Sequence, residues 1–415
     1  MMLRFDIEAQ RIALIVCFLL SLSRLSPAQA PLSADAEISL LTGSPGNALY
    51  TTFGHSAIRV RDPHQSLDLV FNYGTFDFST PNFYMKFLRG KLDYMLSVES
   101  FERFQLGYYY GNQWVIEQVL GLDSVQKQTV FNHLAINYRP ENRYYKYDFF
   151  FDNCATRIRD LFDNSLGDRL INRHPERWTS QPATFRTLLR HYLTGWQMWS
   201  GLGIDIILGM PTDRAALPDE YLFLPDFMAE TYRLSQVITE TGEAQNYVKS
   251  EETIITNRPK PNPPGLLMPR PVTWMLLAAI GLLTALGFYF KKPLRAIDVF
   301  LFGLAGAIGA LIVFLWFFTE HSATKNNLNI LWAWPSHLPL LFLFFRSGKN
   351  VFFKRYLLAY ISILAVLLGS WAWLPQHLNP ALIPILILLI LRSALHLYIY
   401  PFQSSNKNAP GSINN

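Results

Sequence analysis

Cys154 is the residue that most plainly offers chemistry, in the segment YYKYDFFFDNCATRIRD. It follows an aromatic strand and opens a helix predicted from Cys154 to Leu166, which Gly167 ends. Asn153 or Asp152 is a favourable N-cap, so the thiol lies beside unpaired backbone N–H groups and the positive end of the helix dipole. Both effects stabilise a thiolate, the form of cysteine that attacks a carbonyl carbon.

A thiol nucleophile needs a base, and His55 in TTFGHSAIRV is the best placed histidine. It opens a predicted strand directly after Gly54, so its ring projects from a sheet edge toward the helix. Papain-like enzymes use this arrangement, and the reversed chain order, His before Cys, is compatible because such sites are recognised by geometry. Four other histidines compete for the role without a glycine-flanked strand: His64, His133, His174 and His191.

Four further residues are candidates for binding substrate or for orienting the imidazole: Asn72, Tyr73, Asn153 and Arg157. Arg157 lies one turn into the helix and suits a phosphate or a carboxylate. The residues alone leave packing roles open. Cys154 shares a helical face with Ile158 and Leu161, as a small buried hydrophobic residue would.

Several functional classes lack their usual residues. The sequence has no HExxH, CxxC, GxSxG, GxxxxGK or GxGxxG pattern, so zinc hydrolase, thioredoxin-like, serine hydrolase and nucleotide-binding chemistry is not indicated. No metal and no cofactor is expected. Lys and Arg number 36 against 31 Asp and Glu, and several of the basic residues lie in short loops between apolar runs, so no nucleic-acid patch is predicted.

A mixed α/β domain from about residue 35 to 250 must position these groups. Its predicted strands have β-branched, aromatic or alternating character: Glu37 to Leu41, Ser56 to Arg61, Leu67 to Tyr73, Leu92 to Val98, Gln113 to Leu120 and Tyr144 to Phe150. A helix is predicted from the N-cap Asp123 to Asn137.

The first thirty residues have the layout of a secretory signal. Arg4 and Arg11 precede an apolar run, and Ala28-Gln29-Ala30 is a small-x-small cleavage site. Cleavage also removes Cys17 and leaves Cys154 as the only cysteine, so no internal disulfide is possible. An uncleaved anchor stays open as the alternative.

The chain changes character after residue 258. Residues 259–271 are a proline-rich linker, and residues 272–402 hold five apolar stretches predicted to span a membrane: Val272 to Phe290, Val299 to Thr319, Leu328 to Phe345, Tyr356 to Leu374 and Ala381 to Tyr400. Lys and Arg cluster in alternate loops. This places the domain 31–258 in the periplasm and the tail 403–415 in the cytoplasm of an inner-membrane protein. His337 and a proline in the third stretch indicate a cavity or a packed kink.

The segments FGHSAIRV, FNYGTFDF and FDNCATRIRD, followed by the linker and by spans with NLNILWAWPSHL, resemble the Lnb family of lipoprotein N-acyltransferases of Bacteroidota. The resemblance implies a periplasmic α+β thiol-enzyme domain, distantly papain-like and permuted, followed by an all-α five-helix transmembrane domain. It implies transfer of a fatty acyl chain from a membrane phospholipid to the α-amino group of a diacylated lipoprotein. On the matching motifs, Cys154 and His55 are the implied catalytic residues, and a third member is not assigned.

Two other functions are compatible with the same residues. A thiol hydrolase of cell-wall peptide or amide bonds would use the same Cys and His. A non-enzymatic lipid or lipoprotein-binding membrane protein would need neither, and replacing Cys154 by Ser would then leave its function intact. The sequence does not indicate an oligomeric state.

Overall fold

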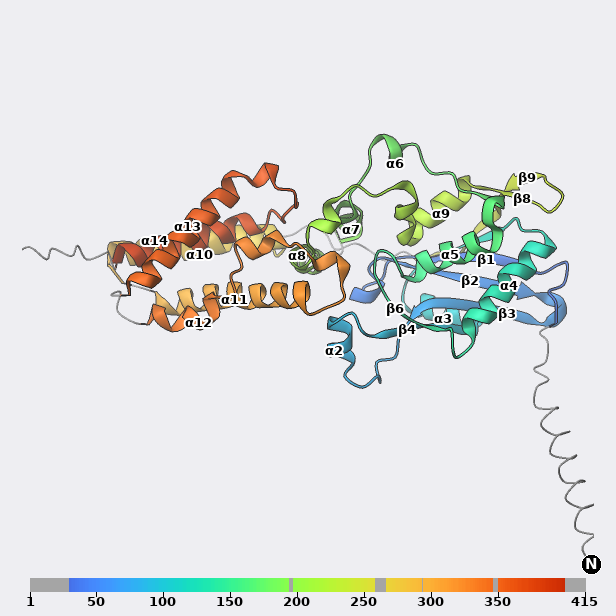
Figure 1. The fold of residues 1–415 in the computed structure, drawn as a ribbon, viewed down its shortest axis with the longest axis horizontal. Helices are drawn as coiled ribbons and strands as arrows, with labels where there is room; N and C mark the ends of the chain where they lie inside the picture. Colours follow the sequence, from blue (N-terminus) through green and yellow to red (C-terminus); the bar gives the residue numbers. More distant parts are fainter. Residues whose placement is uncertain (1–29, 194–196, 258–265, 293, 346–349, 400–415) are drawn as a thin grey trace, which may run out of the picture.

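The computed structural model describes residues 30–193, 197–257, 266–292, 294–345 and 350–399. Within these ranges the chain forms a sheet-and-helix domain and a bundle of apolar helices, which lie end to end along the long axis (Figure 1). The predicted signal residues 1–29, residues 258–265 of the linker and the tail after residue 399 lie outside the described residues.

A seven-stranded antiparallel sheet forms the centre of the N-terminal domain, in the order β10-β5-β1-β2-β3-β4-β6. Its strands are β1 (Glu37–Gly43), β2 (His55–Asp62), β3 (Leu67–Thr75), β4 (Asp93–Ser100), β5 (Val115–Leu120), β6 (Tyr144–Lys146) and β10 (Val248–Ile255). Strands β1 to β5 agree with the predicted strands to within two residues at each end. β6 ends earlier than predicted because the chain turns, and the N–H of Asp152 donates to the carbonyl of Asp148 at 2.9 Å.

Helices cover both faces of this sheet. On one face α4 (Ser124–Tyr138), α5 (Cys154–Leu166) and α9 (Pro225–Leu234) enclose the main core, in which Ile38, Phe71 and Phe162 are buried. α4 begins with the predicted cap, since Asp123 and Gln126 form a capping box. On the other face α3 (Phe101–Tyr110) closes a smaller core.

The N-terminal domain also contains shorter elements. They are α2 (Phe83–Leu88), β7 (Leu170–Ile171), α6 (Arg177–Ser180), α7 (Phe185–Leu193), α8 (Met198–Ile207), β8 (Gln236–Ile238) and β9 (Ala244–Asn246). Of these, α7 and α8 lie on the side of the bundle, and β8 and β9 at the far end (Figure 1). Strands β7, β8 and β9 form a separate small sheet.

Four helices of the described residues are long and apolar enough to cross a membrane: α10 (Pro269–Tyr289), α11 (Arg295–Phe317), α13 (Val351–Gly369) and α14 (Leu382–Ile399). The prediction of five continuous helices is therefore not confirmed. The third predicted stretch forms only short turns: η7 (Leu328–Leu331), α12 (His337–Leu340) and η8 (Leu341–Phe344). Pro335 and Pro339 lie inside this stretch, and each removes a backbone donor that a continuous helix needs.

The broken third stretch nevertheless runs the length of the bundle. At one end Asn329 Nδ2 donates to the carbonyl of Ile206 in α8, at 3.1 Å. At the other end Phe344 packs on Phe353 at the start of α13, with ring centroids 4.9 Å apart. Between them His337 Nδ1 lies 2.7 Å from the hydroxyl of Tyr356. The polar residues of this stretch thus belong to a packed kink.

Buried polar contacts fix the two parts to each other. The guanidinium of Arg186, only 1% exposed, pairs at 3.0 Å with both Asp205 and Asp213. Asn379, just before α14, donates to Asp205 Oδ2 at 2.8 Å. A Cβ on Gly209 would lie 1.8 Å from the carbonyl oxygen of Lys325, so only glycine permits this close approach between the two parts.

Candidate active site

Cys154 is the first residue of α5, as predicted, and Asn153 caps the helix. Asn153 Oδ1 accepts from the N–H groups of Ala155 at 2.8 Å and Thr156 at 2.9 Å, and Thr156 Oγ1 accepts from the N–H of Asn153 at 2.7 Å. A residue at the first helical position has no intrahelical acceptor for its own N–H. The thiol, in a side chain only 9% exposed, therefore lies at the positive end of the helix dipole.

A bulge in β3 brings this helix end against the sheet. The pairing of β3 with β4 shifts between Asn72 and Thr75, and Gly74 within the bulge has a φ of 86°. A Cβ on Gly74 would lie 3.5 Å from Cys154 Cβ. Glycine adopts the left-handed backbone here without strain, and a Cβ at this position would be in van der Waals contact with Cys154.

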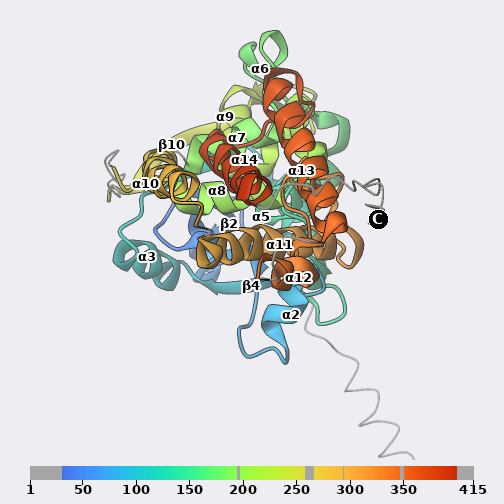
Figure 2. The ribbon, with the colours of Figure 1, turned by 90° about the vertical axis from the view of Figure 1, so that its left-hand side faces the viewer.

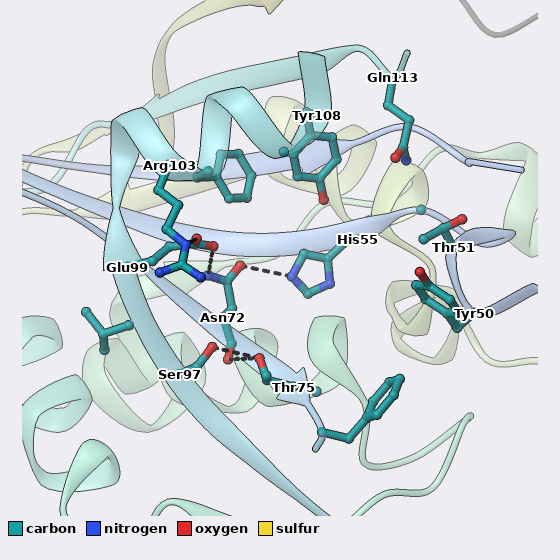
Figure 3. A pocket seen from close by; sticks show the side chains of 16 residues that line it. Tyr50, Thr51, His55, Asn72, Thr75, Ser97, Glu99, Arg103, Tyr108 and Gln113 are labelled. Atoms are coloured by element: carbon teal, nitrogen blue, oxygen red, sulfur yellow. Dashed lines mark hydrogen bonds and ion pairs between the residues drawn. The ribbon is translucent and has the colours of Figure 1, made fainter. Parts of the chain in front are cut away.

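His55 opens β2 and points at Asn72 of the neighbouring strand, with 3.1 Å between His55 Nε2 and Asn72 Oδ1 (Figure 3). Asn72 Nδ2 donates to Glu99 Oε1 at 3.1 Å, which turns the amide oxygen toward the ring. Because an amide oxygen only accepts, Nε2 carries the proton of the neutral imidazole. Nδ1 is left as the basic nitrogen for the thiol.

Charge and hydrogen bonding couple His55 to Cys154. Burial lowers the pKa of His55, but the charge and hydrogen bond of Cys154, followed by the bond to Asn72 and the charge of Glu99, raise it above its ordinary value. Burial raises the pKa of Cys154. The charge and hydrogen bond of His55, together with the N–H groups of Ser56 and Ala155, outweigh burial and lower it. The two shifts favour a thiolate and imidazolium pair.

A cavity of about 570 Å³ lies on the face of the sheet that α3 covers, and His55 is the member of the pair that lines it (Figure 3). Side chains from β2, β3 and β4 form its floor, and α3 and the turn before β2 form its walls. Its lining combines aromatic and polar groups: Tyr50, Thr51, His55, Asn72, Phe76, Ser97, Glu99, Arg103, Phe104, Tyr108 and Gln113. A volume of this size accommodates part of a lipid-sized ligand.

One buried tyrosine near the thiol has an unsatisfied hydroxyl. Tyr145 Oη is shielded from solvent and has no hydrogen-bond partner in the described structure. It would lie 3.8 Å from a Cβ placed on Gly74, the same point that lies 3.5 Å from Cys154 Cβ. Burial, followed by the charge of Cys154, raises the pKa of Tyr145, so this hydroxyl keeps its proton and is a free donor beside the nucleophile.

The predicted site residues lie in different places. Asn72 lines the cavity and orients His55, while Tyr73 points into the core, where its hydroxyl accepts from Asn137 Nδ2 at 2.8 Å. Arg157 pairs with Asp152 and lies 4.0 Å over the Tyr145 ring. Asn153 is committed to the helix cap. Substrate binding by these four residues, Asn72, Tyr73, Asn153 and Arg157, stays a prediction.

The competing histidines have other partners. Three of them lie within hydrogen-bond distance of groups outside the cavity, and one packs edge-on against a tyrosine: His64 with Asp35 (2.7 Å), His133 with Ser165 (2.7 Å), His174 with Asp219 (2.8 Å) and His191 with Tyr192 (5.5 Å between centroids). His55 is thus the histidine whose pKa responds to the thiol.

Sequence reasoning missed Glu99, Gly74 and Tyr145. Glu99 lies two residues after Ser97 on β4, so the two side chains share a face of the sheet. The sequence does not indicate which residue of β3 lies beside Glu99. Gly74 in the segment NYGT was a readable bulge signal. Tyr145 stood in an aromatic run in which nothing distinguishes one ring from another.

The site is tied to the outer end of the bundle. Asp148, in the turn that leads to Cys154, accepts at Oδ1 from the N–H of Phe150 at 2.9 Å. Its Oδ2 accepts from the hydroxyl of Ser322 at 2.9 Å, in the loop after α11. The segment that carries the nucleophile therefore contacts the segment that ends an apolar helix.

Comparison with known proteins agrees with this arrangement. One family model, the Lnb N-terminal periplasmic domain, matches residues 29–191, and a second, the Lnb transmembrane domain, matches residues 261–403. No curated protein and no solved structure matches the chain. The first match covers the domain with Cys154 and His55, and the second covers the apolar helices, so this is a membrane protein with a periplasmic N-terminal domain. The chain belongs to the Lnb family.

Proposed function

We propose that this chain is a lipoprotein N-acyltransferase that carries a fatty acyl group on Cys154 between a phospholipid and the α-amino group of a diacylglyceryl-cysteine lipoprotein. The family domains indicate a lipoprotein-modifying membrane enzyme. The observation that carries the finer proposal is the Cys154, His55 and Asn72 arrangement beside a cavity, at the membrane end of the domain.

The division of roles is that of papain-like thiol enzymes, in permuted order. A cysteine at a helix N-terminus supplies the nucleophile, a histidine on the sheet supplies the base, and an asparagine oxygen holds the ring. Asn72 fits the third role because its amide is oriented by Glu99 and its oxygen faces His55 Nε2. It fills the position that the sequence motifs left unassigned.

In the first half-reaction His55 Nδ1 holds the proton of Cys154, and the thiolate attacks the ester carbonyl of the phospholipid. A C–S bond forms, the ester C–O bond breaks, and the lysophospholipid leaves as an alcohol with the proton from His55. The tetrahedral oxyanion needs donors. The donors we assign to it are the N–H of Cys154, which at the first helical position has no intrahelical acceptor, and the hydroxyl of Tyr145, which has no partner among the described residues.

In the second half-reaction the lipoprotein amine attacks the thioester. The N–C bond forms, the C–S bond breaks, and His55 accepts the proton that the amine loses, which restores the thiolate and imidazolium pair. The lowered pKa of Cys154 makes the thiolate a good leaving group for this step. No other residue is needed for the proton balance.

Mass spectrometry of lipoprotein N-termini tests the proposal. Purified chain in phospholipid vesicles is given a diacylated lipoprotein, and the wild type is compared with Cys154→Ala and His55→Ala. We expect a third acyl chain on the amine with the wild type and none with either variant. The same acylation state in all three would reject the transferase. Release of free fatty acid without N-acylation would favour a hydrolase.

A further inference from the structure

An exposed apolar surface lies on α2 and the turn before it. It consists of four large side chains that are each more than half exposed: Phe78, Tyr84, Met85 and Phe87. Tyr84 is 81% exposed, although soluble surfaces rarely leave several large apolar side chains together in water. We call these four residues the α2 surface.

The position of the α2 surface relative to the spans is fixed by hydrogen bonds. His321, in the loop after α11, has Nε2 3.2 Å from the carbonyl of Phe87 and 3.1 Å from that of Leu88. The N–H of Glu320 donates to the carbonyl of Arg89 at 3.0 Å. α11 ends at Phe317, only a few residues earlier, so α2 lies at the level where that helix leaves the membrane.

The figures agree with this placement. In Figure 1 α2 lies at the junction of the two parts, beside the end of α11, while α4 lies at the far end of the N-terminal domain. Seen along the bundle in Figure 2, α2 lies at the lower periphery, below the helices α10, α11, α13 and α14. Lipid, and not protein, is therefore the expected neighbour of this surface.

The composition of the surface suits a membrane interface. Tyr, Phe and Met are the side chains that partition into the headgroup region. Three basic residues accompany them, Lys86, Arg89 and Lys91, and the last of these is 3.3 Å from Glu320. Aromatic groups combined with cations match the apolar tails and the phosphates of phospholipids.

An aromatic series connects the α2 surface to the cavity. Phe83 in α2 and Phe78 pack with ring centroids 4.9 Å apart. Both contact Phe76, at 5.8 Å and 5.0 Å. Phe76 lines the cavity that His55 also lines, and its ring lies edge-on to that of Tyr50, another lining residue, with 6.2 Å between the centroids. The series therefore connects α2 to the cavity that His55 lines.

We propose that the α2 surface inserts into the outer leaflet of the membrane and that the series Phe83, Phe78 and Phe76 leads a phospholipid acyl chain from that leaflet into the cavity beside His55. The route rests on the proposed acyl transfer; the membrane contact does not. The occupant is a phospholipid of the bilayer that the spans cross.

Photocrosslinking tests the contact without chemistry. Full-length Cys154→Ala protein, which cannot turn over, is placed in nanodiscs that contain a phospholipid with a diazirine in its acyl chain. Peptides are then mapped by mass spectrometry. We expect lipid adducts on residues 78–90 and none on the α4 peptide 124–138. Adducts confined to the spans would overturn the proposal.

A triple variant tests the route. Tyr84→Ser, Met85→Ser and Phe87→Ser together remove apolar area from lipid, and we expect N-acylation from vesicle phospholipid to fall about 10-fold. The matched control is Val125→Ser with Ile136→Ser, two exposed apolar residues on α4, which should transfer at the wild-type rate. An equal rate in the triple variant would refute the route. Lack of transfer by the wild type would refute the proposed function and leave the crosslinking result standing.

Discussion

Replacing Asn72 by Ala tests the orienting role of its amide. The change removes the acceptor 3.1 Å from His55 Nε2 and leaves the rest of the pair in place. A hydrogen bond from a buried charged group contributes about 1.5 to 3 kcal/mol, which corresponds to a rate loss of about 10- to 150-fold. We expect kcat for acyl transfer to fall within this range.

The same variant should change the titration of the thiol. The bond to Asn72 stabilises the imidazolium, so its loss lowers the pKa of His55 and, through the weaker partner, raises the pKa of Cys154. Thiolate is present above the pKa of the cysteine. The acid limb of the alkylation profile must therefore move to higher pH.

The assay is the rate of iodoacetamide alkylation of the peptide with Cys154, measured by mass spectrometry across pH. It needs no lipid and no lipoprotein, so it reports the site alone. Asn137→Ala is the matched control, because Asn137 bonds the hydroxyl of Tyr73 and not the imidazole. An acid limb and a kcat that both stay at wild-type values in Asn72→Ala would refute the assignment.

Three further variants test other parts of the account. Tyr145→Phe removes a buried hydroxyl without a partner, so it should stabilise the protein by about 1 kcal/mol in denaturant unfolding while it slows acyl transfer roughly 100-fold; Tyr247→Phe, another such hydroxyl, should only stabilise. An unchanged transfer rate in Tyr145→Phe would remove it from the oxyanion site. Gly74→Ala forces a left-handed residue with a side chain against Cys154, and unfolding should show a loss of about 1 to 2 kcal/mol together with slower alkylation. Arg186→Met removes the buried cation that Asp205 and Asp213 share, and leaves them only Arg190 and His377 at the edge of the network. It should cost about 3 to 5 kcal/mol, whereas Arg214→Met at the exposed pair with Glu220 should cost less than about 1 kcal/mol. Equal losses in these two arginine variants would contradict the buried network.

The local elements could be predicted from the sequence because their signals are local. The cap at Asn153 and the stop at Gly167 place Cys154 at the first position of its helix. The alternation of β2 and β3 places His55 at the start of a strand. Asn72 and Tyr73 point to opposite faces of β3. Which of them shares a face with the imidazole depends on the register of β3 with β2. That register is a contact between separate segments of the chain, and the types of residues 72 and 73 do not determine it.

The parts that could not be predicted depend on contacts between distant segments. Glu99 reaches Asn72 only through the register of β3 with β4, which contains a bulge. Arg157 suited an anion by type, but Asp152 one turn away takes its guanidinium. The third apolar stretch passed the length test for a span, while its prolines break it into turns that side chains of neighbouring helices stabilise.

The most direct test of the central claim is to trap the acyl group on Cys154. Full-length protein is incubated with phospholipid vesicles and no lipoprotein, then digested and analysed by mass spectrometry. We predict one fatty acyl chain on the Cys154 peptide, removable by hydroxylamine, absent in His55→Ala, and lost on addition of a diacylated lipoprotein as the N-acylated product forms. N-acylated lipoprotein formed at the wild-type rate by Cys154→Ala would contradict the account.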